Sequence, residues 1–304
     1  MMINKSYSKG FVTIATGDLY YYQLAYTLLQ SFKQKSLGNY PFAILCDKEN
    51  EYTAHFDQVI LLPDAKKNYL DKIDLLINCP FDETIFIDAD CIVYNDLSVY
   101  WDIFADATDF SCFGEVLPLN QPSRSWFDGE KLQKVFPGLS YNISMHGGIY
   151  FIRQGEKCQN IHAECYKILD EYDKYSFSRF KKPADEPILA LAMAIHHCRP
   201  VYSGGLAYVW LKRAQYLKVD YFKNYLVQKL NGHIVDSIPL LHFGTVNTKC
   251  FLYQVEKNKV SFDFRYGRPW RNVESIIYYI KSAIKGFPMD LALIVYKAIK
   301  QIIN

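Results

Sequence analysis

The chain has 304 residues, of which 50% are hydrophobic and 22% are charged, enough to bury a large core in one α/β domain with an appendage. Its 34 Lys and Arg residues nearly balance its 32 Asp and Glu residues. Because no strong positive field surrounds such a chain, we do not expect a nucleic-acid partner. Any anion site must then be built from particular residues or from a bound metal.

The cysteines indicate a reducing compartment. All eight are scattered along the chain without a C-x-x-C pair, and several lie within apolar runs, which favours reduced thiols. No long apolar segment follows the first lysines, so a signal peptide is not expected, and no stretch approaches the roughly 20 apolar residues of a membrane span. We expect a cytoplasmic protein that is soluble or peripheral at the inner face of the membrane.

Strands and helices alternate in the first third of the chain. After an apolar run at 11–15 and a turn at 16–18, the spacing of Leu24, Leu28 and Phe32 predicts a helix. Further elements are expected as strands at 42–46, 58–62 and 84–87, and as a helix at about 69–77. This alternation predicts a doubly wound, mostly parallel, Rossmann-like sheet that binds ligands beyond the carboxyl ends of its strands.

The rest of the chain continues this pattern less regularly. Strands are expected at 110–114 and at 147–153, the second opening on two glycines, and a helix at about 157–172. Residues 183–187 are expected to open another helix that runs to His196, since Pro187 suits the first turn and the acidic residues before it suit the helix dipole. The domain is expected to cover residues 1–270.

Residues 271–304 are expected to form C-terminal amphipathic helices. One face carries four isoleucines, with lysines beside it, at Ile276, Ile277, Ile280, Ile284, Lys281 and Lys285. Basic amphipathic helices can lie on an anionic membrane surface. Packing on the domain, or against a second copy of the chain in a homo-oligomer, is an equally open alternative.

The strongest chemical signal is Asp88-Ala89-Asp90, which directly follows an apolar strand. On an extended backbone, residues two apart project to one face. Two carboxylates that close repel each other, and a cation such as Mg²⁺ or Mn²⁺ relieves the repulsion while bridging a diphosphate. In the alternative interpretation, one aspartate caps the following segment and the other is solvated.

With four other segments in the same order, these residues resemble the GT-A glycosyltransferases, in particular the retaining enzymes of glycosyltransferase family 8 and their bacterial relatives of polysaccharide biosynthesis. The resemblance covers about 11–249, and its segments are Ala15–Tyr21, Phe86–Asp90, His146–Phe151, Ala184–Leu189 and Leu241–Gly244. It implies a GT-A fold. It also implies transfer of a sugar, with retention, from a UDP-sugar to a hydroxyl of a glycan or glycolipid. Because no signal peptide is expected and the C-terminal segment is basic and amphipathic, we expect the acceptor to be a growing surface polysaccharide or a lipid-linked oligosaccharide.

The resemblance assigns a role to each matching residue. Asp88, Asp90 and His242 would be the metal ligands, and imidazole beside carboxylates suits Mn²⁺ better than Mg²⁺. Other contacts with the nucleotide sugar would come from Thr16, Asp18, Tyr20, Tyr21, Lys72, Ala89, His146, Gly147, Gly148, Gly244 and Lys249. Without the resemblance, His242 would be a buried, hydrogen-bonded histidine, Lys72 a solvated lysine and Asp18 a helix cap.

Asp185 and Glu186 are the candidate catalytic residues. They match a position that faces the donor sugar and the acceptor in the family, where Gln often follows the Asp, so Glu186 leaves their division of labour open. In an inverting enzyme, one of the two would be the general base.

The chain departs from the family after His242. Relatives place a Gly and a Lys near the diphosphate, followed shortly by Pro-Trp, whereas Pro-Trp occurs here only at Pro269-Trp270. Lys249 or Arg268 would therefore bind the diphosphate, and we favour Lys249.

Two other classes of protein stay open. A haloacid-dehalogenase-type phosphatase also uses D-x-D, but its motif usually follows the first strand, and several β/α units precede Asp88 here. A non-catalytic protein that binds a glycan or a nucleotide would keep the aspartate pair for structure, and would bind UDP without any dependence on metal.

Overall fold

The computed structural model describes residues 7–107, 109–121, 128–175, 177, 182–214, 216–266 and 285. It divides into two compact units, and the boundaries fall inside the first helix and directly after Asp88. The first unit holds residues 1–22, 40–88 and 100–203, and the second holds 23–39, 89–99 and 204–304.

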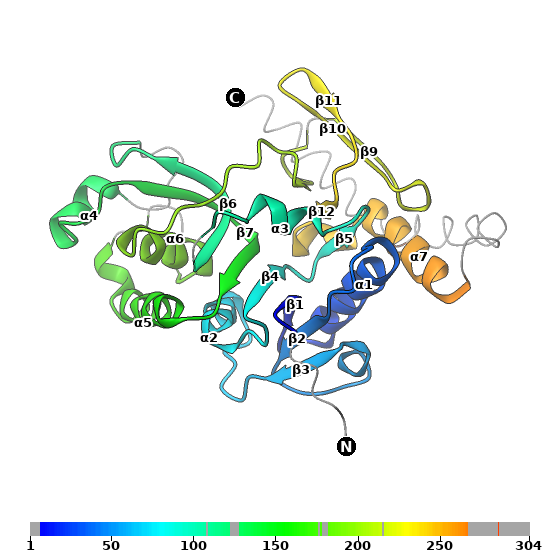
Figure 1. Cartoon of the computed structure of the whole chain (residues 1–304), viewed down its shortest axis with the longest axis horizontal. Coiled ribbons are helices and arrows are strands. Elements are labelled where there is room, and N and C mark those ends of the chain that lie inside the picture. The colour runs from blue at the N-terminus through cyan, green and yellow to red at the C-terminus, as the bar shows by residue number, and fades with distance from the viewer. Residues whose placement is uncertain are drawn as a thin grey trace. The chain divides into compact units, whose positions relative to one another are not determined.

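In its described residues, the first unit is built on a six-stranded sheet with the order β3-β2-β1-β4-β7-β6 (Figure 1). The strands are β1 (Lys9–Ala15), β2 (Phe42–Cys46), β3 (Gln58–Leu61), β4 (Glu83–Ile87), β6 (Phe110–Leu117) and β7 (Asn142–Arg153). The first four are parallel, whereas β7 is antiparallel to both β4 and β6. This confirms the expected α/β fold with a mostly parallel sheet, and it gathers the carboxyl ends of β1, β2 and β4 at one edge.

Both faces of this sheet are covered, which explains the continuous apolar runs of its strands. On one face, Val12, Phe86 and Tyr150 join a core with residues of α5 (Glu156–Asp170) and α6 (Asp185–Ile195). On the other face, the Phe11 ring lies 5.3 Å from the ring of Trp101, measured between centroids. Trp101 belongs to α3 (Val99–Ile103).

Short helices complete the first unit. They are α2 (Leu75–Asn78), α4 (Gly129–Val135) and the 3₁₀ helices η1 (Thr53–His55), η2 (Tyr69–Asp74) and η3 (Tyr172–Tyr175). The helix α6 begins with Asp185, Glu186 and Pro187 in its first turn, as the sequence predicts. The two carboxylates therefore lie at the positive end of the helix dipole.

In the part that the structure describes, the second unit carries two small sheets, with the orders β5-β12-β8 and β11-β10-β9. Their strands are β5 (Cys91–Val93), β8 (Tyr208–Trp210), β9 (Leu217–Asp220), β10 (Tyr225–Leu230), β11 (His233–Val235) and β12 (Leu240–His242). The helices are α1 (Leu19–Lys35), which crosses the unit boundary, η4 (Tyr221–Lys223), η5 (Thr245–Lys249) and α7 (Phe251–Tyr266).

A buried polar cluster ties α7 to the segments before it in the second unit. Glu256 Oε2 accepts hydrogen bonds from Tyr94 OH at 3.0 Å and from Tyr221 N at 2.8 Å. Its other oxygen lies 2.8 Å from Lys259 Nζ. Burial raises the pKa of Glu256, while the Lys259 ammonium opposes that rise. Since each charged group has partners, the cluster avoids the cost of a buried unpaired charge, and we assign it a structural role.

Two expectations about single elements are wrong in detail. The helix expected at 69–77 is the 3₁₀ helix η2 followed directly by the short α-helix α2. At the start of η2, the Asn68 side chain accepts a hydrogen bond from Leu70 N. The strand expected at 147–153 begins at Asn142, because residues 142–145 pair with β6. Gly147 and Gly148 therefore lie inside the strand and not at its start.

The expected amphipathic helices of 271–304 lie outside the described residues, Lys285 apart, and so does Arg268. The division of the chain at residue 270 stays a prediction for the same reason. In the described part of the chain, no helix is both long enough and apolar enough to cross a membrane.

Candidate active site

Asp88 directly follows β4 in the first unit, and Lys72 of η2 reaches its carboxylate. Lys72 Nζ lies 2.8 Å from Asp88 Oδ1 and 2.9 Å from Asp88 Oδ2. The two side chains are only 13% and 16% exposed, so water screens their attraction weakly. Lys72 is therefore a paired lysine and not a solvated one.

The same ammonium group also reaches two neighbours of Asp88. Lys72 Nζ donates to Gly147 O at 3.1 Å and lies 3.5 Å from Asp185 Oδ2. Tyr150 OH donates to that same Asp185 oxygen at 3.4 Å. One lysine thus balances two carboxylates, which come from the end of β4 and the start of α6.

Glu186 lies beside this cluster and contacts the backbone of β7. Its Oε1 accepts a hydrogen bond from Gly147 N at 2.9 Å. Burial and the neighbouring Asp185 carboxylate raise the pKa of Glu186 to about 7, against the opposing effect of Lys72. A carboxyl group with such a pKa exchanges its proton near neutral pH, as a general acid or base must.

Gly147 of β7 allows this close approach. A Cβ atom on Gly147 would lie 2.5 Å from Glu186 Oε1, so a side chain there would displace the carboxyl group. Gly148 O accepts a hydrogen bond from Asp88 N at 2.9 Å. The neighbouring His146 accepts one from Gly148 N at its Nδ1 atom, at 3.3 Å. The first unit thus brings together seven of the expected site residues, which are Lys72, Asp88, His146, Gly147, Gly148, Asp185 and Glu186.

The turn after β1 is held by two aspartates, Asp47 directly after β2 and Asp71 within η2. Thr16 Oγ1 donates to Asp71 Oδ2 at 2.7 Å, and Gly17 N donates to Asp47 Oδ1 at 3.0 Å. Gly17 has a φ of +79°, a conformation that glycine adopts without strain. Asp71 directly precedes Lys72, so the segment that supplies the lysine is also fastened to this turn.

Asp18 caps the helix that follows the turn. Its Oδ1 atom accepts a hydrogen bond from Tyr20 N at 2.7 Å, as an N-cap side chain does. The rings of Tyr20 and Tyr21 meet edge to face, with 6.2 Å between their centroids. Tyr21 is 38% exposed, which leaves aromatic surface open to solvent. Asp18 therefore caps α1, whereas the expected contact of Asp18, Tyr20 and Tyr21 with a nucleoside stays a prediction.

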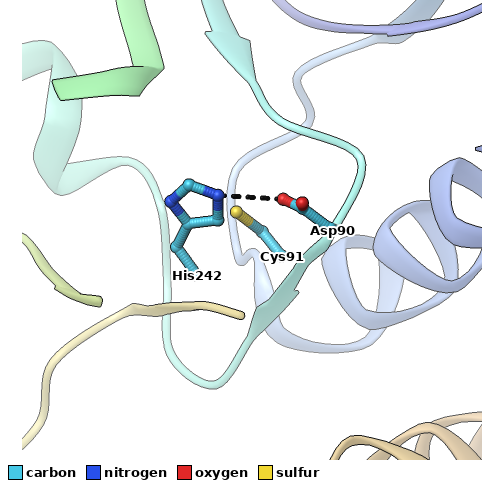
Figure 2. Close-up of side chains that lie close together, drawn as sticks. All are labelled: Asp90, Cys91 and His242. Carbon is cyan, nitrogen blue, oxygen red and sulfur yellow. Dashed lines mark ion pairs between the residues drawn. The ribbon is translucent and has the colours of Figure 1, made fainter. Parts of the chain in front are cut away.

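The second unit contains Asp90 and His242, the other two expected metal ligands (Figure 2). His242 Nε2 lies 2.9 Å from Asp90 Oδ1. Thr245 Oγ1 donates to Asp90 Oδ2 at 2.9 Å, and Phe243 N donates to Asp90 O at 3.2 Å. The aspartate is therefore oriented by the segment that carries the histidine.

The strands β5 and β12 explain how residues so distant in the chain meet. The antiparallel pair places His242 directly opposite Cys91 and, one residue further along, Leu241 opposite Ile92. Asp90 directly precedes β5, and it is almost fully buried, as are Ala89 and His242. One ligand atom from each of Asp90, Cys91 and His242 falls within 4.8 Å of the other two. A carboxylate, a thiol and an imidazole are all metal-binding groups, so the residues present fit a divalent cation.

Two further expected contacts lie on the segment after β12. Gly244 has a φ of +74°, which turns the chain from β12 into η5. Lys249 is the last residue of η5, and its side chain is exposed. Its role in binding a diphosphate stays a prediction.

Solved structures of glycosyltransferases have a fold similar to that of this chain. No family model matches the chain, and no curated protein matches it in sequence. Among solved structures, the chain is similar to the apo form of WbbM, a bifunctional glycosyltransferase, with a TM-score of 0.53 and 15% identity over 92% of this chain. It spans about half of that chain, 52% of its length.

A second similar structure is the galactosyltransferase LgtC in complex with donor and acceptor sugar analogues. The TM-score is 0.50 and the identity 10%, over 90% of this chain and 95% of the other. At such low identity the likeness concerns the fold alone. The chain thus has the α/β fold of GT-A glycosyltransferases, with a central, mostly parallel sheet, as the resemblance in sequence implies.

Proposed function

We propose that this protein is a metal-dependent glycosyltransferase that moves a sugar from a nucleotide diphosphate sugar, a UDP-sugar, to a hydroxyl group of a glycan or glycolipid. The observation that carries the proposal is the Asp90–His242 pair, 2.9 Å apart and shielded from water, in a chain with a glycosyltransferase fold. Asp90 ends the one D-x-D segment of the sequence, which directly follows β4. In α/β sheets, ligands bind beyond the carboxyl ends of such strands.

Asp88, Asp90 and His242 are the proposed ligands of Mn²⁺, or of Mg²⁺. When bound, the cation would supply positive charge to stabilise the departing diphosphate. Lys72 is the proposed contact with the donor, and without metal its ammonium group neutralises Asp88 and Asp185. Lys249, at the end of η5, is the proposed second cation for the diphosphate.

The turn after β1 is the proposed nucleoside site. Thr16 is fixed by Asp71, and Asp18 by its cap to Tyr20 N, so both polar groups are held in one orientation before a ligand arrives. Preorganised groups lose less entropy on binding. Tyr20 or Tyr21 would stack on the base, and Gly147, Gly148, Ala89 and Gly244 would let the backbone approach the donor.

Asp185 and Glu186 are the proposed catalytic pair. In a retaining reaction, the leaving phosphate itself can accept the proton of the acceptor hydroxyl, and no dedicated base is needed. In that case Asp185 and Glu186 orient the donor sugar and the acceptor.

An inverting mechanism is the second candidate, and one observation favours it. The pKa of Glu186, raised to about 7 by burial, suits a general base at neutral pH. NMR of the product decides between the two, because retention gives the anomer of the donor and inversion gives the opposite one.

The acceptor is proposed to be a growing surface polysaccharide or a lipid-linked oligosaccharide at the cytoplasmic face of a membrane. The six cysteines of the first unit, which include Cys165, are free thiols, in keeping with a reducing compartment.

Residues 271–304 would contact the membrane surface or a second copy of the chain. Deletion of 271–304 should then reduce membrane partitioning or the oligomeric state, and unchanged values of both would contradict this role.

Calorimetry of UDP with and without Mn²⁺, on the wild type and on Asp90→Ala, tests the central proposal. We expect tight binding only for the wild type with Mn²⁺. Equal binding in all four cases would remove the proposed metal site. Release of UDP from UDP-sugars in the presence of an acceptor then separates an enzyme from a protein that only binds nucleotides.

A further inference from the structure

Cys91 lies at the centre of the second unit's polar site, although no sequence motif points to it. Its sulfur lies close to the His242 ring and the Asp90 carboxylate (Figure 2). The side chain is fully buried, whereas Asp90 and His242 keep 6% and 8% of their surface exposed. The three side chains therefore form one buried group in which the thiol is the least exposed.

We infer that Cys91 is a direct ligand that makes the Asp90–His242 site thiophilic, so that Zn²⁺ and Co²⁺ bind there more tightly than Mn²⁺. The inference deepens the proposed function and rests on it, because Asp90 and His242 are the proposed ligands of the activating metal. Its consequence is regulatory. Zn²⁺ would displace Mn²⁺ from the site.

The β5–β12 strand pair and the segment after it hold all three proposed ligands in place. Cys91 and His242 are directly opposed in the β5–β12 pair, so their backbones are fixed by the ladder of hydrogen bonds. Asp90 is fixed next to them by Thr245 and by the Phe243 amide. Their ligand atoms, within 4.8 Å of one another, need only small side-chain rotations to surround one ion. A preformed set of this kind binds metal without a large cost in ordering the chain.

The chemistry of the donor set favours zinc over manganese. Thiolate ligands select soft or borderline ions, and imidazole suits zinc, while Mn²⁺ stands lowest in the usual order of affinity. Asp88, by contrast, has both carboxylate oxygens within 3 Å of Lys72, at 2.8 and 2.9 Å. A soft metal can thus be held by the second unit's residues without competing with that ammonium. As the metal–sulfur bond forms, the thiol proton passes to solvent.

The test uses Co²⁺ as a spectroscopic probe on the full chain, with a phosphine and not a thiol as reductant. A Co²⁺–thiolate bond gives a charge-transfer band in the near ultraviolet, which carboxylate and imidazole ligands do not give. We expect the band in the wild type and its loss in Cys91→Ala. Cys165→Ala is the matched control, since Cys165 is also fully buried but lies on α5 in the first unit, and it should keep the band.

Affinities measured by competition complete the test. Mutation of a residue that only hydrogen-bonds to a metal ligand typically lowers metal affinity by about 10–100-fold. Because Cys91 is proposed as a direct ligand, its loss should weaken Zn²⁺ binding by at least about 100-fold. The affinity for Mn²⁺ should change by less than about threefold. Co²⁺ binding without the band in the wild type overturns the inference. So does a band that persists in Cys91→Ala. The wild-type spectrum decides even if that variant does not fold, and Cys91→Ser serves as the second variant.

The two proposals fail in different ways. Binding of UDP that depends on Mn²⁺, together with no thiolate band, would sink the inference about Cys91 and leave the glycosyltransferase proposal standing. A thiolate band that depends on Cys91, together with UDP binding that ignores metal, would support the thiophilic centre and reject its place in sugar transfer.

Discussion

His242 Nε2 and Asp90 Oδ1 lie 2.9 Å apart, and both side chains are about nine-tenths buried. Removing either partner leaves the other in a poorly hydrated place, at a cost of about 1–3 kcal/mol. We expect Asp90→Ala and His242→Ala each to lower the free energy of unfolding by about that amount, measured in urea without divalent metal. The double variant should lose less than the sum, with a coupling of at least about 0.5 kcal/mol.

The exposed His233 of β11 gives the matched control for this cycle. His233→Ala combined with Asp90→Ala should be additive, since His233 is exposed on β11 whereas Asp90 is buried next to β5. If Asp90→Ala and His242→Ala were also additive, the pair would contribute nothing to the site, and the metal proposal would lose its main support.

Lys72 is expected to compete with metal for Asp88. Without metal, Lys72→Met removes the cation that balances Asp88 and Asp185 and should lower the free energy of unfolding by about 2–4 kcal/mol. Mn²⁺ should then stabilise Lys72→Met more than it stabilises the wild type, because a bound cation replaces the lost ammonium. Thermal unfolding with and without Mn²⁺ measures both effects.

Lys9→Met is the control for that experiment. Lys9 pairs with Glu83 at 2.8 Å, but its side chain is 46% exposed, so its loss should cost less than about 1 kcal/mol. Mn²⁺ should not restore the stability that Lys9→Met loses. Equal stabilisation of the wild type and Lys72→Met by Mn²⁺ would argue that the metal does not approach Asp88.

Much of the fold was predictable because its strands are covered on both sides. The runs at 11–15 and 42–46 contain few polar residues, as in a parallel sheet with helices on each face. Asp88 follows such a run, so its place at the ligand-binding edge could be predicted from local sequence. The start of β7 was missed, because the strand was expected only from the apolar run after Gly147, whereas residues 142–145 alternate polar and apolar side chains and pair with β6.

The contacts of the candidate site were less accessible to sequence reasoning. Cys91 meets His242 because β5 pairs with β12, and three-residue strands separated by about half of the chain carry no local signal for that pairing. Lys72 reaches Asp88 because η2 is fastened at Asp71, a contact between side chains far apart in sequence. Local patterns predict which residues stand at strand ends, whereas tertiary pairing decides which of them touch.

Asp18 offers a test that separates a helix cap from a ligand contact. Asn caps a helix about as well as Asp does, whereas Ala costs about 1 kcal/mol. Asp18→Asn should therefore unfold like the wild type, and Asp18→Ala should be less stable. If the carboxylate also binds the nucleoside, Asp18→Asn should weaken UDP binding by about tenfold in calorimetry. Wild-type affinity in Asp18→Asn would assign the residue to capping alone.

Glu186 should make stability depend on pH in a definite direction. Burial raises the pKa of Glu186 from 4.5 to about 7 in the folded chain, so between these values the folded state holds the proton more tightly than the unfolded state. Its stabilising effect is then complete below about pH 4.5 and is lost as pH rises through about 7, at a rate of at most about 1.4 kcal/mol per pH unit. Glu186→Gln, which cannot ionise, should lack this decline in urea unfolding across that interval.

Glu83 supplies a control of the opposite sign. A hydrogen bond from Lys9 lowers the pKa of Glu83, so its contribution is present above about pH 4.5 and is lost as pH falls further. Glu83→Gln should therefore change the pH dependence of stability only below about pH 4.5, whereas Glu186→Gln should change that dependence between about pH 4.5 and 7. If the wild type and Glu186→Gln show the same pH profile through that interval, the Glu186 carboxyl is ionised in the folded chain at neutral pH. The buried carboxyl would then have no proton to exchange near pH 7, and the inverting mechanism would lose the one observation that favours it.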